Sequence, residues 1–347
     1  MLKNILRALV AGVIWATTLG VAFANVAVKD SYPDVYYVKP GDTLWDISGT
    51  FLHEPWRWPE IWHSNTQIHN PHLIYPGDRI SLRYVDGKPQ LVVNGGGTVK
   101  LSPGVRVEDL QAPIPTIPMN AIQTFLKEAL VLTAVEVEEA PYILGGQNRR
   151  VIFGQGDVVH VRDPKNRWQE LASNYGIYRV GHRYVDESTN EILGYEAIKI
   201  GEATVQDKNQ DVVSMLVRKS EEEIRAGDKI FMVPSRELTA GLYPQAPKEK
   251  IEGDIIRLFG RLTSVARHDV VVVNRGAREG LEVGNVLETY QRGENVRDPQ
   301  RAEVVRLPDT KSGLLVLFSV FEKVSFGLVM ESYLPIYKSD AVRSPTE

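Results

Sequence analysis

Four histidines lie close together in residues 35–84, and a cluster of histidines is a natural place to look for a metal site. They are His53, His63, His69 and His72. Zinc sites in proteins use pairs of ligands at short characteristic spacings, often with cysteine thiolates among them. The spacings here match no such pair, and the chain of 347 residues contains no cysteine. We therefore predict that these histidines hold no metal ion and that the protein uses no cofactor.

Catalytic residue patterns are missing from the rest of the sequence as well. Without cysteine, the chain is not a cysteine peptidase or an L,D-transpeptidase. His160, His182 and His268 stand singly and far apart, unlike the ligands of a zinc peptidase. No Gly-x-Ser-x-Gly elbow, Ser-x-x-Lys motif or P-loop occurs. We predict that the protein is not an enzyme; the alternative is a glycan hydrolase whose two carboxylates are hidden among 44 acidic residues.

Composition restricts the class of protein further. Hydrophobic residues make up 43% of the chain and charged residues 24%, as in globular proteins, and the length suits two or three domains. The 40 basic and 44 acidic residues give a net charge of −4 (40 − 44). Such a balanced charge does not favour a nucleic-acid-binding protein.

The first 24 residues have the three parts of a secretory signal peptide. Lys3 and Arg7 form a basic start, Ala8 to Gly20 is an apolar run, and Ala22-Phe23-Ala24 is a cleavage site of small residues. The alternative is an uncleaved membrane anchor, but the apolar run is short for a helix that spans a bilayer. We predict cleavage after Ala24 and an exported, soluble mature protein.

Four elements should organise the histidine- and tryptophan-rich stretch. Residues 35–38 are β-branched or aromatic and predict a strand. The pair Thr43 and Asp46 forms a capping box at the start of a short helix. Residues 58–62 begin a second helix with a proline in its first turn. Residues 79–84 alternate as in a strand, so the order is strand, helix, helix, strand.

This order and two sequence motifs resemble the LysM family. The first motif is Tyr37-Val38-Lys39-Pro40-Gly41-Asp42-Thr43-Leu44-Trp45-Asp46-Ile47, and the second is Asn70-Pro71-His72-Leu73-Ile74-Tyr75-Pro76-Gly77-Asp78-Arg79-Ile80. The stretch Glu54–Trp58 departs from the family pattern because it lengthens the connection between the helices. The resemblance implies binding of N-acetylglucosamine polymers, here the glycan strands of peptidoglycan.

The resemblance also implies a shallow groove between two loops as the glycan site. The residues at the matching positions are Gly41, Asp42, Thr43 and Leu44 in one loop, and Asn70, Pro71, His72, Leu73 and Ile74 in the other. Several of these have structural roles whether or not sugar binds, such as the turn at Gly41. We expect Trp45 and Trp62 to lie in the core, and the roles of Trp56 and Trp58 stay open between core and sugar contact.

Beyond residue 118 the sequence indicates a helix and then a duplicated β-rich region. Apolar residues from Ile122 to Leu130 have helical spacing, and Pro113, Pro115 and Pro118 should keep the preceding connector extended. Four pairs of segments recur in the same order along the rest: Gly156-Asp157-Val158 with Gly284-Asn285-Val286, Gly194-Tyr195-Glu196 with Gly313-Leu314-Leu315, Leu216–Ser220 with Leu328–Ser332, and Gly227-Asp228 with Ser339-Asp340.

We therefore predict a multidomain α+β protein, with a small βααβ LysM domain followed by two related β-rich modules of the SH3-like barrel or sandwich type. The predicted boundaries are a signal peptide at 1–24, the LysM domain at 35–84, a linker at 85–118, a first module with its leading helix at 119–234, and a second module at 250–343.

The whole chain resembles the type IV pilus secretin-associated protein family (TsaP), and its second module resembles the C-terminal domain of the flagellar protein FlgT. The segments that carry this likeness are Ala112–Pro118, Phe125-Leu126, Ala140–Ile143, Gly194–Glu196, Glu223–Asp228 and Val273–Gly276. The family implies a periplasmic protein that forms a ring-like multimer on the outer-membrane secretin and holds it to the cell wall. The alternative is a general cell-wall-binding envelope protein without secretin contact.

Overall fold

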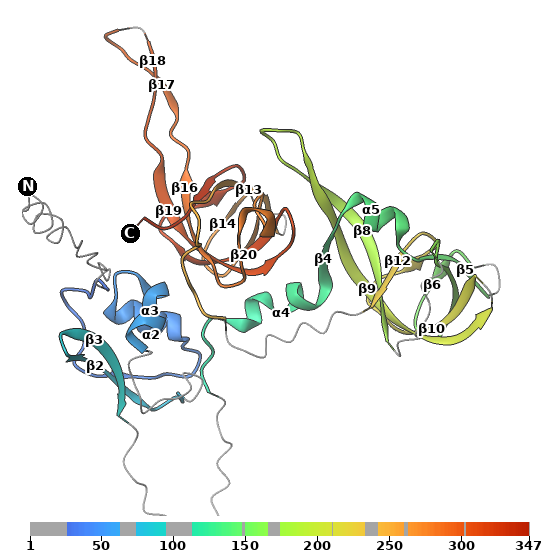
Figure 1. The fold of residues 1–347 in the computed structure, drawn as a ribbon, viewed down its shortest axis with the longest axis horizontal. Coiled ribbons are helices and arrows are strands. Elements are labelled where there is room, and N and C mark those ends of the chain that lie inside the picture. The colour runs from blue at the N-terminus through green and yellow to red at the C-terminus, as the bar shows by residue number, and fades with distance from the viewer. Residues whose placement is uncertain are drawn as a thin grey trace, which may run out of the picture.

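The computed structural model describes residues 26–62, 74–94, 113–147, 150–165, 174–209, 211–232, 242–259, 263–301 and 303–346. The predicted signal peptide therefore lies outside the described residues, and so do residues 70–73 of the predicted groove. Figure 1 shows a small N-terminal α/β unit and two β-barrels joined by the α4 region. None of the helices within the described ranges has the length and apolar character needed to cross a membrane.

The N-terminal unit contains the predicted strands and helices and one further strand. Its elements are β1 (Tyr36–Tyr37), α2 (Leu44–Phe51), η1 (Pro55–Arg57), α3 (Trp58–Trp62), β2 (Arg79–Val85) and β3 (Lys88–Asn94). The three strands form one antiparallel sheet in the order β1-β2-β3. Their apolar side chains and those of the helices enclose a core that includes Ile47, Phe51, Ile61 and Ile80.

Strand β3 corrects the predicted linker, which began at residue 85. Asp86 and Gly87 have φ angles of 50° and 75°, so they form a two-residue turn that folds the chain back onto β2. Leu91 is fully buried in the core of the N-terminal unit. Residues 88–94 thus belong to this unit because their apolar face completes its core.

Helix α4 (Met119–Glu128) occupies most of the predicted helical segment. The prediction extended the helix to Leu130, but Ala129 already belongs to β4 (Ala129–Leu132). Strand β4 pairs with a longer strand of the first barrel, and this pairing outweighs the helical spacing of the last two apolar residues. A short helix, α5 (Ala134–Glu139), follows β4.

Six strands of the first barrel close into a ring. They are β5 (Tyr142–Gly146), β7 (Val158–Arg162), β8 (Tyr175–Val185), β9 (Ile192–Asn209), β10 (Val212–Ser220) and β12 (Lys229–Met232). The sheet runs β10-β7-β5-β12-β8-β9, and the pairing of β10 with β9 closes it. The short strands β6 (Ile152–Phe153) and β11 (Ile224–Arg225) pair beside this ring.

The second barrel has the same strand connectivity. Its ring is β13-β15-β20-β19-β16-β22, built from β13 (Glu252–Leu258), β15 (Val270–Val273), β16 (Val286–Gln291), β19 (Thr310–Val320), β20 (Ser325–Ser332) and β22 (Ala341–Arg343). The strands β5, β7, β8, β9, β10 and β12 occupy the corresponding positions in the first ring. The short pair β14 (Ser264–Val265) and β21 (Ile336–Tyr337) likewise corresponds to β6 and β11.

An insertion between β16 and β19 distinguishes the second barrel from the first. A hairpin of β17 (Asn295–Arg297) and β18 (Val304–Arg306) extends the β16–β19 connection away from the barrel (Figure 1). The two barrels therefore share a common strand plan and differ in this connection. A short 3-10 helix, η3 (Ala277–Glu279), lies between β15 and β16, and the equivalent connection of the first barrel is described only in part.

The strand plan corrects one of the four predicted repeat pairs. Gly156-Asp157 precedes β7, whereas Gly284-Asn285 precedes β16, which corresponds to β8. The equivalent of Gly156-Asp157 is His268-Asp269, before β15. Asp157 accepts a hydrogen bond from Gly154 N at 2.9 Å, and Asp269 accepts one from Ala266 N at the same distance. The sequence comparison missed this pair because His268 takes the positive φ, 72°, that glycine takes in the first barrel.

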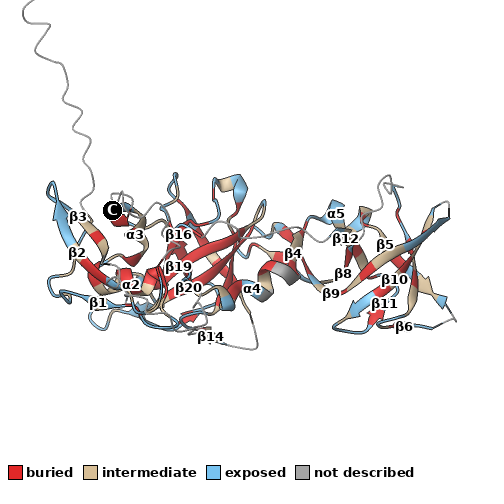
Figure 2. Ribbon diagram, turned by 90° about the horizontal axis from the view of Figure 1, so that it is seen from below, coloured by how far each residue is buried: buried red, intermediate tan, exposed pale blue. Residues whose placement is uncertain are grey.

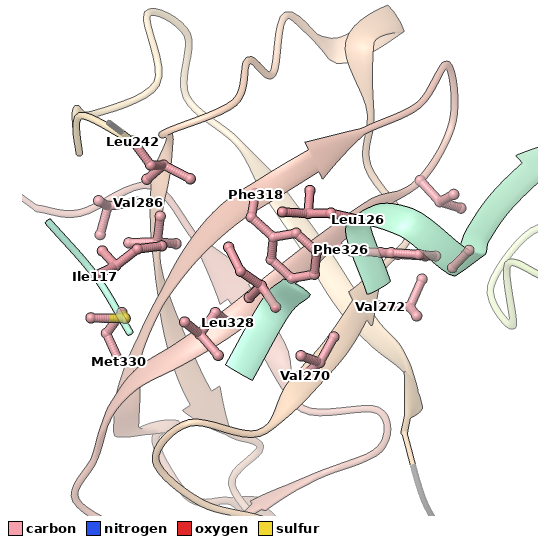
Figure 3. Packing of buried hydrophobic residues seen from close by; sticks show 14 of the residues in the cluster. Ile117, Leu126, Leu242, Val270, Val272, Val286, Phe318, Phe326, Leu328 and Met330 are labelled. Carbon is pink, nitrogen blue, oxygen red and sulfur yellow. The ribbon is translucent and has the colours of Figure 1, made fainter. Parts of the chain in front are cut away.

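The second barrel is buried on both sides of its wall. Val271, Leu315 and Val329 point into the barrel, and their neighbours along the same strands point outward into a second cluster. Figure 3 shows this outer cluster, in which Ile117 of the connector and Leu126 of α4 cover outward residues of the barrel. Strands that are buried on both faces read as continuous apolar runs, which explains the sequences VVVV of β15 and LLVLF of β19.

The second barrel lies between the N-terminal unit and the first barrel, although the chain reaches it last (Figures 1 and 2). Trp45 of α2 is 1% exposed and packs into the outer cluster of this barrel. Arg267 forms an ion pair with Asp46, and the rings of Trp58 and Tyr243 have centroids 5.6 Å apart. The N-terminal unit is therefore packed against the second barrel.

Candidate functional site

The first predicted loop is held by its own side chains. Thr43 Oγ1 accepts a 3.2 Å hydrogen bond from Asp46 N, and Asp46 Oδ2 accepts one of 3.2 Å from Thr43 N, so the predicted capping box is confirmed. Asp42 Oδ2 accepts hydrogen bonds from Lys39 N at 2.8 Å and from the Tyr36 hydroxyl at 3.0 Å. Burial, together with the Asp42 carboxylate, raises the pKa of Tyr36 to about 12. The Asp42 carboxylate therefore supports the loop.

Exposure differs sharply among the predicted site residues in this loop. Gly41 is exposed and has a φ of 91°, with open space where a Cβ would lie. Asp42 is half-buried, whereas Thr43 and Leu44 are only 3% and 1% exposed. Thr43 and Leu44 are thus covered along both side chain and backbone, and Gly41 and Asp42 are the members of this loop that reach solvent.

The second predicted loop is described only at its end. Asn70, Pro71, His72 and Leu73 lie outside the described residues. Ile74 is fully buried in the core of the N-terminal unit. Its carbonyl oxygen accepts a 2.9 Å hydrogen bond from Ile114 N of the connector.

The connector contacts Leu44 and Trp45 at the start of α2 and Ile74 at the end of the second loop. Leu44 N donates to the Pro115 carbonyl at 3.0 Å, and Trp45 N donates to the Thr116 carbonyl at 3.2 Å. Together with the bond between Ile114 and Ile74, these contacts bridge both sides of the predicted groove. The sequence motifs did not predict this contact. Two apolar residues among the prolines of the connector, Ile114 and Ile117, could have indicated it.

The tryptophans of this domain differ in how deeply they are buried and in what they pack against. Trp45 and Trp62 are 1% and 3% exposed, which confirms that they belong to the core. Trp58, whose role the sequence left open, is 1% exposed and lies in the same core as Trp62. Trp56 is partly buried against the outer cluster of the second barrel. The inserted stretch Glu54–Trp58 therefore supplies contacts with the core and the second barrel.

A metal site receives no support from the residues that the structure describes. Within them, no three or more histidines and carboxylates come together in a way that would hold a metal ion. His53 is the one member of the four-histidine cluster inside the described ranges.

Residues 36–83 match the family model of the LysM domain. A curated relative, the uncharacterized protein YqbP of Bacillus subtilis (strain 168), is 37% identical over 62 residues. This alignment covers 15% of the present chain and 28% of the relative, so the likeness extends over little more than a quarter of that protein.

The N-terminal unit is therefore a LysM domain. A LysM domain is a binding module, and its presence in this chain supports binding of glycans such as peptidoglycan. The start of α2 has backbone donors at Leu44 and Trp45, and Ile74 has a backbone acceptor, all three being bonded to the connector in this structure. Such groups suit a neutral ligand that carries amide functions.

Proposed function

We propose that this is a non-catalytic periplasmic protein that binds peptidoglycan and anchors the outer-membrane secretin of the type IV pilus machine to the cell wall. The observation that carries the proposal is the LysM match at residues 36–83. The proposal includes export by a signal peptide cleaved after Ala24 and association of the mature protein with the cell wall and the outer-membrane complex. A general wall-binding protein without secretin contact remains the second candidate.

The chemistry of an N-acetyl sugar supports the groove as the glycan site. An N-acetyl group offers one N–H donor, one carbonyl acceptor and one methyl group. The amides of Leu44 and Trp45 can donate to sugar carbonyls, and the Ile74 carbonyl can accept from a sugar N–H. Gly41 to Leu44 and Asn70 to Ile74 then form the two sides of the groove.

Avidity supports a multimeric assembly. A single shallow groove of this kind binds sugar with a dissociation constant on the order of 0.1–1 mM. Several copies on a ring-shaped secretin would gain a factor of about 100 or more through effective concentration. In this proposal the LysM domain contacts the glycan, while the two barrels contact the secretin or one another.

Co-sedimentation with purified peptidoglycan sacculi tests the glycan part. Asn70→Ala and His72→Ala should each lower the bound fraction at least severalfold, since both are predicted groove residues. Tyr84→Ala is the control, because this side chain is 59% exposed on β2 and lies outside the predicted groove. Unchanged binding by both groove variants would overturn the assignment of the second loop, and release of soluble sugar fragments would show a hydrolase.

Crosslinking in cells, followed by identification of the attached proteins, tests the secretin part. We expect the secretin among the crosslinked proteins. A chain that lacks residues 35–94, the LysM unit including β3, should lose binding to sacculi and keep its crosslink to the secretin. Wall binding without any secretin crosslink would favour the second candidate.

A further inference from the structure

The connector occupies the place that the proposed function gives to the glycan. Residues 113–116 alternate between exposed and buried, with Pro113 and Pro115 outward and Ile114 and Thr116 inward. Ile114 is 4% exposed and belongs to the core cluster of the LysM domain. An extended segment of this chain thus lies against the start of α2 on one side and against Ile74, the end of the second loop, on the other.

The connector also uses the polar groups that a glycan would need. The Leu44 and Trp45 amides donate to the carbonyls of Pro115 and Thr116 at 3.0 and 3.2 Å, and the Ile74 carbonyl accepts from Ile114 at 2.9 Å. These are the donors and the acceptor that would serve an N-acetyl group. The buried Ile114 side chain supplies an apolar contact where a sugar would offer its methyl group. Connector and glycan therefore cannot use these groups at the same time.

We propose that residues 113–117 act as a built-in competitor of the glycan, so that sugar binding requires their displacement from the groove. This inference rests on the proposed function, because it takes the groove to be the glycan site. The glycan affinity of the intact chain is then the affinity of the open groove reduced by the fraction of molecules in which the groove is open.

Displacement would also change how the LysM domain is held. The same connector continues to Ile117, which is fully buried with Trp45 in the outer cluster of the second barrel. If the connector left the groove, Ile117 would no longer pack beside Trp45 in this cluster. The ion pair of Asp46 with Arg267 is partly exposed and contributes little to holding the domain in place. Glycan binding would therefore remove the connector's share of this packing and leave the contacts of Trp56 and Trp58 in place.

Calorimetric titration of the full chain with a hexamer of N-acetylglucosamine measures the competition. Ile114→Ser removes the apolar contact of the connector and should tighten binding about tenfold, as expected when a mostly closed groove opens. Ile143→Ser is the matched control, since Ile143 is 1% exposed in the core of the first barrel. The control should leave the affinity for the hexamer unchanged.

A second variant leaves the LysM core intact. Pro115 is exposed and contacts the groove through its carbonyl, so Pro115→Gly adds freedom to the displaced connector without removing a buried side chain. We expect tighter binding by about two- to fivefold. Hydrogen exchange followed by mass spectrometry then reports on the connector: the peptide that contains the Ile114, Thr116 and Ile117 amides should exchange faster when the wild-type chain is saturated with hexamer.

The outcomes separate this inference from the proposed function. If the wild-type chain binds the hexamer, both connector variants bind it equally well and the connector stays protected, the inference is wrong while glycan binding stands. If no variant binds the hexamer or sacculi, glycan binding and the inference both fail. Tighter binding by both variants, with faster exchange of the connector, supports the inference.

Discussion

Asn274 in the second barrel donates a 2.9 Å hydrogen bond from Nδ2 to Asp186 Oδ2 in the first barrel. The two residues are 1% and 3% exposed, so the bond is buried. Asp186 directly follows β8 at the end of the β8–β9 hairpin, and Arg275 approaches the same carboxylate oxygen at 3.5 Å. This hairpin therefore joins the two barrels through a buried polar contact.

Removal of the Asp186 carboxylate should weaken this contact. Asp186→Ala leaves the Asn274 Nδ2 group buried without its partner, which costs about 1–3 kcal/mol of unfolding free energy, and it also removes the hydrogen bonds from Ser188 and Thr189 in the turn. Urea denaturation followed by circular dichroism measures the change. Glu187→Ala is the control, because its pair with Lys338 is 56% exposed on both sides and should change stability by no more than about 0.5 kcal/mol. Equal effects of the two variants would contradict a special role for Asp186.

A second contact at this hairpin should depend on pH. Glu191 accepts hydrogen bonds from Arg278 at 2.8 Å and Lys323 at 2.7 Å, and these two cations lower its pKa to about 2. Since the folded-state pKa lies below the ordinary value of 4.5, the contribution is complete above pH 4.5 and is lost as the pH falls toward 2. Comparison of urea unfolding for the wild type and Glu191→Gln should show a difference at pH 7 that disappears near pH 2.

The comparison of the wild type with Glu191→Gln isolates the titration of Glu191 from that of the other acidic groups in the hairpin. Burial alone would raise the pKa of Asp186, but hydrogen bonds from Ser188 and Thr189 and the charge of Arg275 outweigh it and lower the pKa. Both proteins keep Asp186, so its titration cancels in the difference. A difference between the proteins that stays constant from pH 7 to pH 2 would contradict the assigned role of Glu191.

Local signals in the sequence were sufficient to predict the LysM domain. The capping box of Thr43 and Asp46 depends only on neighbouring residues, and the structure contains it. The position of this domain against the second barrel depends on residues far away in the chain, such as Arg267 beside Asp46. No periodicity or turn motif reports such a pairing, so the sequence predicted the domain but not its neighbours.

The contents of the predicted groove also depend on long-range contacts that the sequence motifs do not reveal. Matching positions in a family motif identify Leu44 and Ile74, but they do not show what lies against these residues in this chain. Pro115 and Ile114 belong to a segment that composition describes as an extended linker. Only the folded chain places that segment on the groove, through hydrogen bonds that any backbone could make.

Binding to peptidoglycan should resist salt. Residues 35–84 contain four basic and five acidic residues, so the domain has a net charge of −1 (4 − 5). Attraction to the carboxylates of peptidoglycan is therefore not the main source of affinity, and short-range sugar contacts are barely screened by ions. Co-sedimentation with sacculi should be nearly unchanged between 0.05 M and about 0.5 M sodium chloride, where the Debye length falls to a few ångströms. A steep loss of binding over this range would contradict recognition through the groove.

Equivalent turns in the two barrels allow a reciprocal exchange of residues. Gly227 has a φ of 93° before β12, and Ser339 has a φ of 70° at the same place before β22. The next residue in each turn closes it in the same way: Asp228 accepts from Arg225 N at 2.7 Å, and Asp340 accepts from Tyr337 N at 2.9 Å. The two turns thus have the same geometry with different residues at the left-handed position.

Gly227→Ser should destabilise the first barrel, and Ser339→Gly should stabilise the second. A left-handed conformation costs a non-glycine residue about 1–2 kcal/mol, and the greater freedom of glycine in the unfolded chain offsets about 0.4–1 kcal/mol of this. We therefore expect a loss of about 1 kcal/mol for Gly227→Ser and a gain of up to about 1 kcal/mol for Ser339→Gly, measured by urea denaturation. Gly154→Ser is the control, because Gly154 has open space around it and no positive φ. If Gly154→Ser cost as much as Gly227→Ser, backbone conformation would not be the reason for glycine in this turn.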